Sequence, residues 1–381
     1  MNFLKKQSPV RIISLGFALV ILIGSVLLSL PCSIRDGVTL RYIDALYMST
    51  SAVCVTGLLT VDAGDTFTPL GQFFLGMLIQ VGGLGVTAVG TGVILAMGKK
   101  INLKARNLIR EAGNLDSGKG VIRFIRLVFL TTVTFELAGA ALSFLVFRKN
   151  FPPLKAAGVS LFHSVASFNN SGFDILGGGQ NLIPYQDDVL LNLVTCALVI
   201  FGGIGFLVIR EVIAKRFRWK KLSMHAKVVL FMSLVLTAAG TVLLKLTEDI
   251  TWMGAFFTSV SARTAGFSTF PLGSFSGAGL LTVIVLMVIG ASPGSTGGGI
   301  KTTTCYVLFE GIRSSATNTS EKAFRYAVPA DAFRKAAVIT LLAIGIVLSG
   351  TYILVILEPG VPFLDALFEM SSAFGTAGLS T

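Results

Sequence analysis

Four short segments of this chain share one pattern, and each ends with a glycine followed by a large apolar residue. An aromatic residue lies ten positions before each glycine, and a small residue lies five positions before it. The glycines are Gly57, Gly172, Gly266 and Gly378, in the segments 42–58, 159–173, 252–267 and 362–379. Each segment is shorter than the roughly 20 residues that cross a bilayer as a helix, yet each lies between segments of that length. The pattern therefore predicts four re-entrant hairpins around one pore with pseudo-fourfold symmetry, and such a pore passes ions.

The composition is that of a membrane protein. Hydrophobic residues make up 53% of the chain and charged residues only 13%, which does not suit a soluble globular domain. Apolar runs long enough to span a bilayer occupy residues 10–30, 70–97, 121–147, 189–212, 228–246, 280–308 and 336–357. The run at 280–308 is interrupted. We therefore predict an all-α integral membrane protein with the lipid bilayer as its surroundings.

The charges are distributed asymmetrically. Of the 31 Lys and Arg residues, 24 fall at the N-terminus or in the stretches 99–126, 210–227 and 301–335, whereas acidic residues gather in the connections that carry the hairpins. The positive-inside rule then places the N-terminus in the cytoplasm and the four hairpins outside. Because the net charge of +12 is spread over loops that flank membrane spans, it does not indicate nucleic-acid binding. An acidic outer face would raise the local concentration of cations.

The order of span, hairpin and span (M1-P-M2) recurs along the chain. The predicted units are residues 1–100, residues 101–220, residues 221–315 with a broken M2 helix, and residues 316–381, which hold only M1 and P. By comparison with the three complete units, we expect an eighth helix to follow Thr381. Without that helix the fourth wall of the pore would be incomplete.

Each hairpin is predicted to contribute backbone carbonyl groups to a potassium selectivity filter. Backbone at that depth must be hydrogen-bonded or line a cavity, and rings of carbonyl oxygens can replace the hydration shell of an ion. Glycine supplies the conformational freedom, and a short helix directs its negative C-terminal end at the ion. The residues before the glycines differ, so backbone oxygens should matter more than side chains. The predicted filter residues are Val55, Thr56, Gly57, Asn170, Ser171, Gly172, Thr264, Ala265, Gly266, Thr376, Ala377 and Gly378.

The interrupted run carries a glycine-rich break about one membrane depth from Gly266. No helix continues through Pro293 and five glycines, so this segment must face water or ions. Its place below the predicted filter suits a gate, and Lys301 could add an electrostatic barrier to cations. The predicted gating residues are Gly290, Ala291, Ser292, Pro293, Gly294, Ser295, Thr296, Gly297, Gly298, Gly299 and Lys301. The segment resembles a phosphate-binding loop, but Ile300 stands where that motif needs glycine.

Other glycines and two ionisable residues fall within the apolar segments. The pairs Gly82–Gly83 and Gly202–Gly203 occupy corresponding places in two runs and favour close helix packing. We expect both runs to be continuous, so that 280–308 is the only broken span.

Glu136, in the middle of a span, suits either a hydrogen bond between helices or a functional role. Arg263 is expected to point behind the filter, toward loop carbonyls or toward an acidic residue such as Asp365 or Glu369.

The hairpin motifs resemble a known family. The sequences VTGL, NSGF, TAGF and TAGL, between paired helices, are similar to those of the Trk/Ktr/HKT potassium transporter superfamily, and SVSARTAGF and SSAFGTAGLST look most like a bacterial KtrB-type membrane subunit. The resemblance implies a homodimer with one pore per subunit in the bacterial cytoplasmic membrane. It also implies an intramembrane gating loop at 290–301, a cytoplasmic ring of nucleotide-binding KtrA-type subunits, and potassium flux with sodium as activator. In related plant proteins a serine at the first filter glycine accompanies sodium preference, so Gly57 implies potassium.

Two alternatives to a channel-like potassium uptake subunit have different consequences. One is a carrier with alternating access, in particular a sodium-coupled or sodium-selective cation carrier of the same superfamily. Such carriers often have inverted repeats and paired broken helices, whereas the repeats here are parallel. The other is an integral membrane enzyme, for which the sequence offers no cluster of metal ligands, no serine–histidine pair and no cofactor motif. We therefore expect no enzyme, no covalently bound cofactor, and potassium as the only metal ion, at the filter residues.

Overall fold

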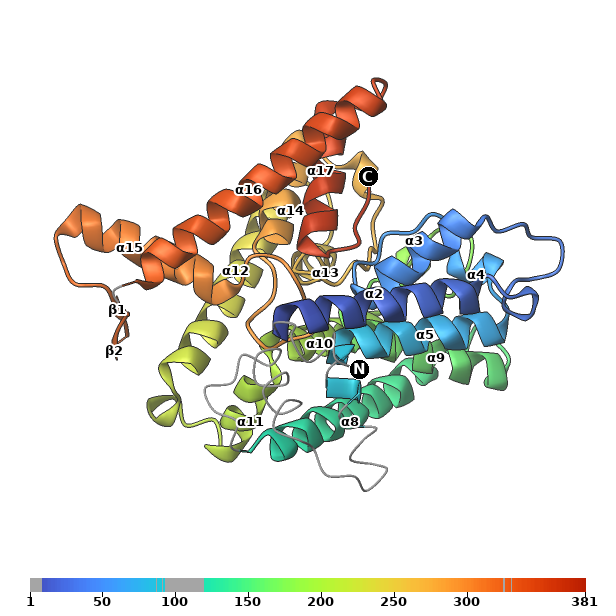
Figure 1. Cartoon of the computed structure of the whole chain (residues 1–381), viewed down its shortest axis with the longest axis horizontal. Helices are drawn as coiled ribbons and strands as arrows, with labels where there is room; N and C mark the ends of the chain where they lie inside the picture. The colour runs from blue at the N-terminus through green and yellow to red at the C-terminus, as the bar shows by residue number, and fades with distance from the viewer. Residues whose placement is uncertain (1–8, 87, 91, 93–119, 325, 330) are drawn as a thin grey trace. The chain divides into compact units, whose positions relative to one another are not determined.

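The structure, a computed structural model, describes residues 9–86, 88–90, 92, 120–324, 326–329 and 331–381 (Figure 1). It is mostly helical, which confirms the predicted class. The chain divides into two compact units, Met1–Asn181 and Leu182–Thr381. Residues 93–97 of the second apolar run, the basic residues of 99–119 and N-terminal Lys5 and Lys6 lie outside the described residues.

The first unit pairs long apolar helices with short ones. Its elements are α2 (Pro9–Leu28), η1 (Pro31–Ser33), α3 (Tyr42–Val53), α4 (Ala63–Thr66), α5 (Pro69–Leu84), α8 (Val121–Phe147) and α9 (Pro153–Phe168). Proline opens α5 and α9, where it needs no intrahelical hydrogen bond, and the Thr68 hydroxyl caps α5 by accepting from the Gly71 N–H. The short helix α3 packs against α2 and α5, and α9 packs against α8 and α5.

The second unit continues the alternation of long and short helices. Its elements are η2 (Ile183–Tyr185), α10 (Val189–Ile204), α11 (Phe206–Ala214), η3 (Trp219–Lys221), α12 (Met224–Thr247), α13 (Trp252–Ser261), η4 (Leu272–Ser274), α14 (Gly277–Val288), α15 (Thr302–Thr317), β1 (Lys322–Ala323), β2 (Tyr326–Ala327), α16 (Ala332–Leu357) and α17 (Phe363–Gly375). The short helix α13 packs against α12 and α10, and α17 packs against α16 and α14.

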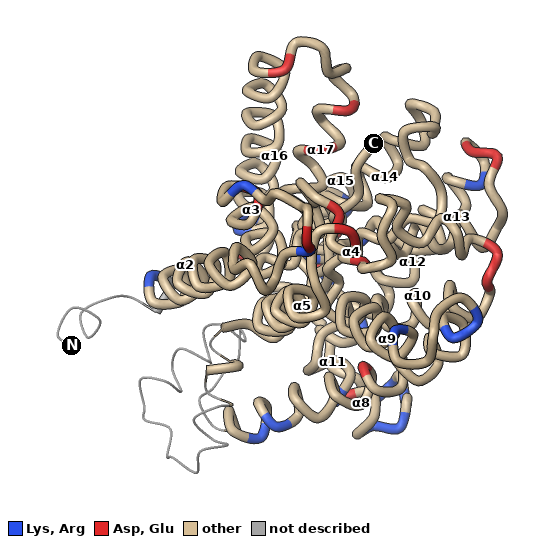
Figure 2. The backbone as a smooth tube through the Cα atoms, turned by 90° about the vertical axis from the view of Figure 1, so that its right-hand side faces the viewer, with Lys and Arg blue, Asp and Glu red and all other residues tan. Residues whose placement is uncertain are grey.

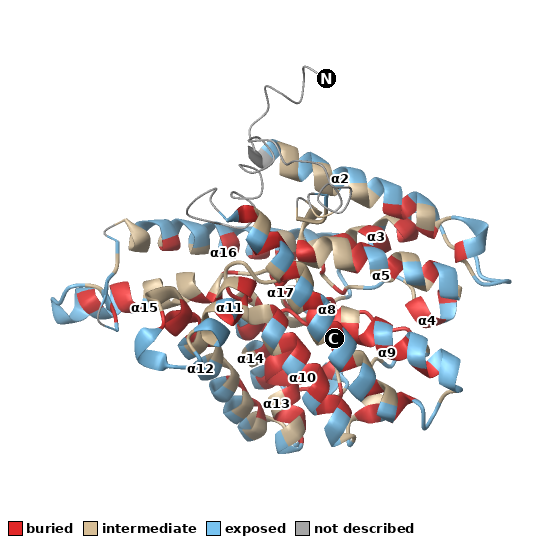
Figure 3. Cartoon of the chain, turned by 90° about the horizontal axis from the view of Figure 1, so that it is seen from below, coloured by how far each residue is buried: buried red, intermediate tan, exposed pale blue. Residues whose placement is uncertain are grey.

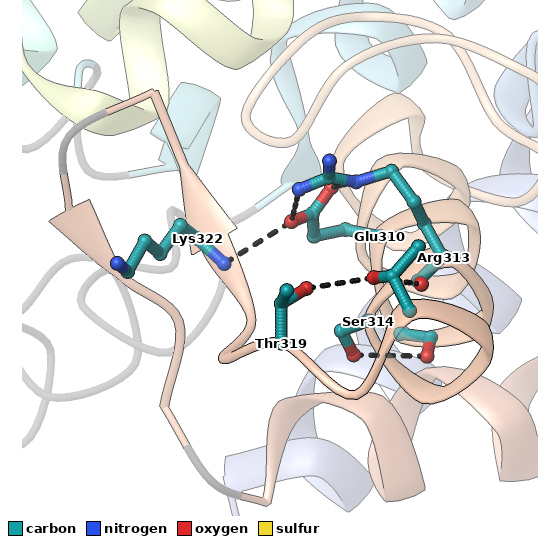
Figure 4. Close-up of polar contacts among 7 residues, drawn as sticks. Glu310, Arg313, Ser314, Thr319 and Lys322 are labelled. Atoms are coloured by element: carbon teal, nitrogen blue, oxygen red, sulfur yellow. Dashed lines mark hydrogen bonds and ion pairs between the residues drawn. The ribbon is translucent and has the colours of Figure 1, made fainter.

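The two strands form a small antiparallel hairpin that is tied to α15. The Glu310 carboxylate accepts two hydrogen bonds from the Arg313 guanidinium, at 2.6 and 2.9 Å, and one from the backbone N–H of Lys322 at 3.2 Å (Figure 4). The ring of Phe324, at the tip of the hairpin, stacks on Tyr306 of α15. These contacts fix the connection between α15 and α16.

Four helices of the described chain are long and apolar enough to cross a membrane. They cover Arg11–Leu28, Val121–Phe147, Met224–Thr247 and Ala332–Leu357, and α10 with α11 would make a fifth span bent by 97°. Charged residues lie at the ends of α2 and α16 rather than in their middles (Figure 2). Exposed residues recur along the same two helices (Figure 3), and large apolar ones such as Leu19 and Leu341 are among them. Such surfaces are suited to lipid.

The prediction that only one span is broken is wrong. Helix α5 ends at Leu84 and α10 ends at Ile204, and each is followed by a glycine with positive φ, 83° at Gly85 and 96° at Gly205. A residue with such a φ cannot continue a right-handed helix. The apolar runs 70–97 and 189–212 are therefore interrupted, as is 280–308 between α14 and α15.

Three short helices are held to the preceding long helix by a serine hydroxyl. Ser49, Ser164 and Ser259 donate to the carbonyls of Ile21, Glu136 and Thr237, at 2.7, 2.7 and 2.9 Å. Each acceptor lies three residues before a glycine of the long helix, which is Gly24, Gly139 or Gly240. A Cβ atom at Gly24 or Gly240 would collide with the serine hydroxyl, so glycine is what permits this close approach. Sequence reasoning missed the contact, although the glycines within apolar runs were a signal for it.

Candidate functional site

The four short helices end with the same unusual backbone conformation. The residue two positions before each of the four glycines Gly57, Gly172, Gly266 and Gly378 is left-handed, with φ of 55° at Val55, 59° at Asn170, 73° at Thr264 and 52° at Thr376. The glycines that follow also have positive φ, between 69° and 87°. A left-handed conformation costs a non-glycine residue about 1–2 kcal/mol, and it is least expected at β-branched residues. Its recurrence at one position shows that the chain is forced onto the same path after each helix.

A hydrogen bond closes the helix end in each segment. The N–H of the residue before the glycine donates to the carbonyl five residues earlier in three segments, from Thr56, Ser171 and Ala377, at 2.7, 2.9 and 2.9 Å. This is the long bond of a Schellman motif, which usually has glycine at the left-handed position. In the segment 252–267 the pattern differs by one residue, because Ala265 and Gly266 both donate to the carbonyl of Ser261.

The carbonyl groups beyond these caps are available to a ligand. Within the described chain, no hydrogen bond ends on the carbonyl oxygens of Thr56, Gly57, Gly266, Ala377 or Gly378. Three of these residues, Gly57, Gly266 and Ala377, are nevertheless buried. A buried carbonyl without a donor is costly unless a cation or water takes the donor's place. The geometry therefore fits carbonyl coordination of a cation, chemistry that needs no particular side chain.

The predicted gating segment is a closed loop between α14 and α15. Gly290 donates its N–H to the carbonyl of Ile300 at 3.0 Å, and Ala291 donates to Gly298 at 3.1 Å. The two ends of the loop therefore meet. Gly294 and Gly299 have φ of 69° and 68°, which only glycine adopts without strain.

This loop lies against the left-handed threonines that follow α13 and α17. The N–H of Gly298 donates to Thr376 Oγ1 at 3.1 Å. A Cβ atom at Gly297 would collide with Thr264 Oγ1. Lys301 Nζ donates to the loop's own carbonyls, at 2.6 Å to Gly297 and 3.4 Å to Gly298. The structure thus brings two predicted filter segments and the predicted gating segment into contact within the second unit.

The loop is also bonded to the corner between α10 and α11. Ser292 and Thr296 donate their N–H groups to the carbonyls of Gly203 and Gly202, at 3.0 and 3.3 Å, and the Phe206 N–H donates to the carbonyl of Gly294 at 3.2 Å. The second glycine pair therefore contacts the loop. The first pair does pack closely as predicted, because a Cβ atom at Gly82 would meet the backbone of Val53 and one at Gly83 would meet Asn169.

Gly205→Ala is expected to destabilise the protein more than Gly85→Ala. Both glycines have a backbone conformation that costs a side-chain-bearing residue about 1–3 kcal/mol. A Cβ atom at Gly205 would in addition lie 2.8 Å from the Pro293 carbonyl oxygen, whereas at Gly85 it would meet no described atom within 4 Å. The melting temperature of the purified variants, followed by size-exclusion chromatography after heating, measures the difference. Equal losses for the two variants would contradict the close contact.

The structure corrects one predicted interaction and identifies another. Arg263 donates to the backbone carbonyl and hydroxyl of Ser233 and to the hydroxyl of Thr237, all on α12. The expectation that Arg263 bonds to loop carbonyls or to the acidic residues of α17 is wrong, because α13 packs against α12 and Arg263 bonds to that helix instead. Glu136 makes the hydrogen bond between helices that was one of its two expected roles, accepting from Asn169 Nδ2 at 3.1 Å.

Acidic residues collect in the connections of the first unit. Asp62 and Asp65 each accept a backbone N–H at 2.8 Å, from Gly179 and Gly178. Burial raises the pKa of the nearby Asp174 carboxyl to about 6, and repulsion from Asp62 and Asp65 adds to the effect. Among the described residues, no group of three His, Cys, Asp or Glu side chains could hold a metal ion. The hydrogen bonds of Asp62 and Asp65 join the two connections that carry Asp65 and Gly178.

Comparison with known proteins gives consistent matches over nearly the whole chain. The sequence profile named TrkH, cation transport protein, matches residues 17–248 and 222–381. The potassium/sodium uptake protein NtpJ of Enterococcus hirae is 35% identical over 99% of this chain and 86% of its own length. The Ktr system potassium uptake protein B of Bacillus subtilis is 36% identical over 98% of this chain and 85% of its own length.

The fold has a solved counterpart. The crystal structure of the potassium transporter TrkH from Vibrio parahaemolyticus superimposes with a TM-score of 0.71, covering 95% of this chain and 76% of that one. The sequences are 19% identical, so this likeness concerns the fold alone.

Proposed function

Because the chain belongs to the TrkH family of cation transport proteins, we propose that it takes up potassium across the cytoplasmic membrane through a channel-like pore. The membership confirms the family resemblance of the hairpin motifs, and with it a transporter rather than an enzyme. Relatives that cover the chain almost fully are named for potassium uptake, and one of them for potassium and sodium. Potassium is the proposed substrate.

One observation carries the proposal most directly. At one register position in all four segments, a non-glycine residue and the following glycine hold left-handed conformations, and several carbonyls beyond them accept no hydrogen bond within the described chain. Four segments of this kind, arranged with pseudo-fourfold symmetry, would form a ring of oxygens that replaces the hydration shell of potassium. The C-terminal ends of the short helices would add negative potential. In this arrangement the predicted units 1–100, 101–220, 221–315 and 316–381 would each contribute to one wall of the pore.

The loop at 290–301 is proposed as the gate. Its contacts with Thr264 and Thr376 support a place directly below two filter segments. The ammonium group of Lys301 lies against the loop carbonyls. Its positive charge would repel a cation in the same space. The names of three relatives refer to a Ktr system, which supports regulation by a partner subunit. We propose a KtrA-type nucleotide-binding ring as that partner, a homodimeric membrane subunit, and sodium as an activator.

A sodium-coupled or sodium-selective carrier is the competing function, because one relative is named for both ions. Gly57 favours potassium, since a backbone site without a hydroxyl ligand suits the larger ion.

Complementation of a bacterium that lacks potassium uptake tests the proposal. Cells that express this chain with its genomic partner subunit should grow at low external potassium and accumulate a potassium or rubidium tracer. Sodium should accelerate this uptake without itself being accumulated. Sodium accumulation without potassium uptake would favour the carrier, and no cation uptake at all by protein in the membrane would refute the proposal.

A further inference from the structure

The residue three positions before each glycine is the last residue before the left-handed turn. These residues are Cys54, Asn169, Arg263 and Gly375. Asn169 and Arg263 have polar side chains, and both bond to the long helix that precedes their own short helix. Asn169 contacts α8 and Arg263 contacts α12. The other two positions have a thiol and no side chain at all.

Asn169 is fully buried in a polar cluster of the first unit. Its Nδ2 donates at 3.1 Å to Glu136 Oε1, at 2.9 Å to Gln80 Oε1 and at 2.9 Å to the carbonyl of Val165. Gly83 leaves the space that the Asn169 side chain occupies, because a Cβ atom there would collide with it. The amide thus ties the last turn of α9 to α8 and to α5.

Arg263 occupies the matching position in the second unit. Its Nη1 donates to the Ser233 carbonyl at 3.2 Å and to Thr237 Oγ1 at 3.4 Å, and its Nη2 donates to Ser233 Oγ at 3.4 Å. Among the described residues, it forms no ion pair with a carboxylate. Burying an arginine among apolar helices without a carboxylate partner costs free energy. Arg263 therefore does more than fill space.

Glu136 and Thr237 are equivalent anchors. Each lies three residues before the glycine at which the short helix approaches, Gly139 or Gly240. Each receives two bonds from the short helix. The backbone carbonyl accepts from a serine, Ser164 or Ser259, and the side chain accepts from the residue before the left-handed turn. This double attachment holds both the middle and the end of the short helix.

We propose, on the basis of the proposed function, that the pairs Asn169–Glu136 and Arg263–Thr237 are positioning residues for ion selectivity. They fix the ends of α9 and α13, and the left-handed Asn170 and Thr264 follow directly. A shift of either helix end would move the carbonyls of its filter segment. The first and fourth segments lack such a side chain, so two of the four segments carry the attachment that sets the size of the ion site.

Thr237→Val removes one hydroxyl and keeps the shape and the backbone carbonyl of the anchor. It is expected to lower the ratio of potassium to sodium tracer uptake about three- to tenfold, the effect of one lost hydrogen bond. Thr247→Val is the matched control, because the Thr247 hydroxyl bonds only to the carbonyls of Leu243 and Leu244 in its own helix, at 3.0 and 3.5 Å. In the first unit, Glu136→Leu should lower the ratio, whereas Glu136→Gln keeps an acceptor for Asn169 and should retain it.

The ratio is measured in potassium-uptake-deficient cells with variant levels matched by immunoblot. A T237V protein of normal level and unchanged ratio overturns the proposal for Arg263, and equal ratios for E136L and E136Q overturn it for Asn169. If E136L does not reach the membrane, the single variants E136Q and N169L are compared instead. A normal ratio in N169L is then the contradicting result. Absence of uptake by the unmodified chain would refute the proposed function itself, which is a separate outcome.

Discussion

Removal of residues 291–299 is expected to raise potassium uptake several-fold and to make it less dependent on the cytoplasmic partner. The loop lies against Thr264 and Thr376, two threonines of the proposed filter, and its removal would open the space below them. The chain can reclose at little cost, because Gly290 and Ile300 are already hydrogen-bonded at 3.0 Å. A partner that acts by biasing loop conformations has nothing to bias once the loop is absent.

Uptake of a rubidium tracer with and without the partner subunit measures both effects. Replacement of the same stretch by alanines and leucines is the comparison, since it should straighten the α14–α15 span and change gating without changing the preference for potassium. A deletion variant that is normal in amount and in size-exclusion profile, yet transports less or still requires the partner, would show that the loop is not the gate.

Gly57→Ser is expected to keep the protein in the membrane and to weaken discrimination of potassium over sodium. Gly57 has φ of 87°, and the carbonyl of Thr56 before it accepts no hydrogen bond within the described chain. A serine there would bear a left-handed strain of about 1–2 kcal/mol and add a hydroxyl ligand suited to a smaller ion. The expected change is a lower ratio of potassium to sodium uptake, with slower growth at limiting potassium.

Gly37→Ser is the matched control for strain. Gly37 has φ of 82° in the connection before α3, and a Cβ atom there would meet nothing within 4 Å. It should therefore show a similar loss of stability and normal discrimination. If G57S is well expressed and its selectivity equals that of G37S, Gly57 does not line the filter.

The sequence was sufficient to predict the helical class, the four short helices and the glycines that end them. It was not sufficient to predict the left-handed residues before those glycines. Val55 and Thr376 have intrinsic preferences for extended backbone, so only the closure of the helix end against the rest of the fold imposes that conformation. The broken helices had a signal that went unused, because Gly-Gly-x-Gly occurs at both Gly85 and Gly205.

The partner of Arg263 could not be read from the sequence either. A search for an opposite charge suggested acidic residues, whereas the guanidinium donates through its two Nη atoms to a carbonyl and two hydroxyls of α12. Backbone carbonyls carry no sequence signature, and which of them face a given side chain depends on how two helices pack.

The attachment of the 290–301 loop to the α10–α11 corner determines which residues of the loop can be substituted without breaking it. All three bonds join main-chain atoms. The N–H groups of Ser292, Thr296 and Phe206 donate to the carbonyls of Gly203, Gly202 and Gly294, in that order. Substitution of the donor side chains leaves the bonds in place. Natural variation can therefore remodel the polar surface of the loop, and with it the response to a regulator, while the mechanical link to α11 persists. Only at a crowded glycine such as Gly205 does a single substitution disturb the link itself.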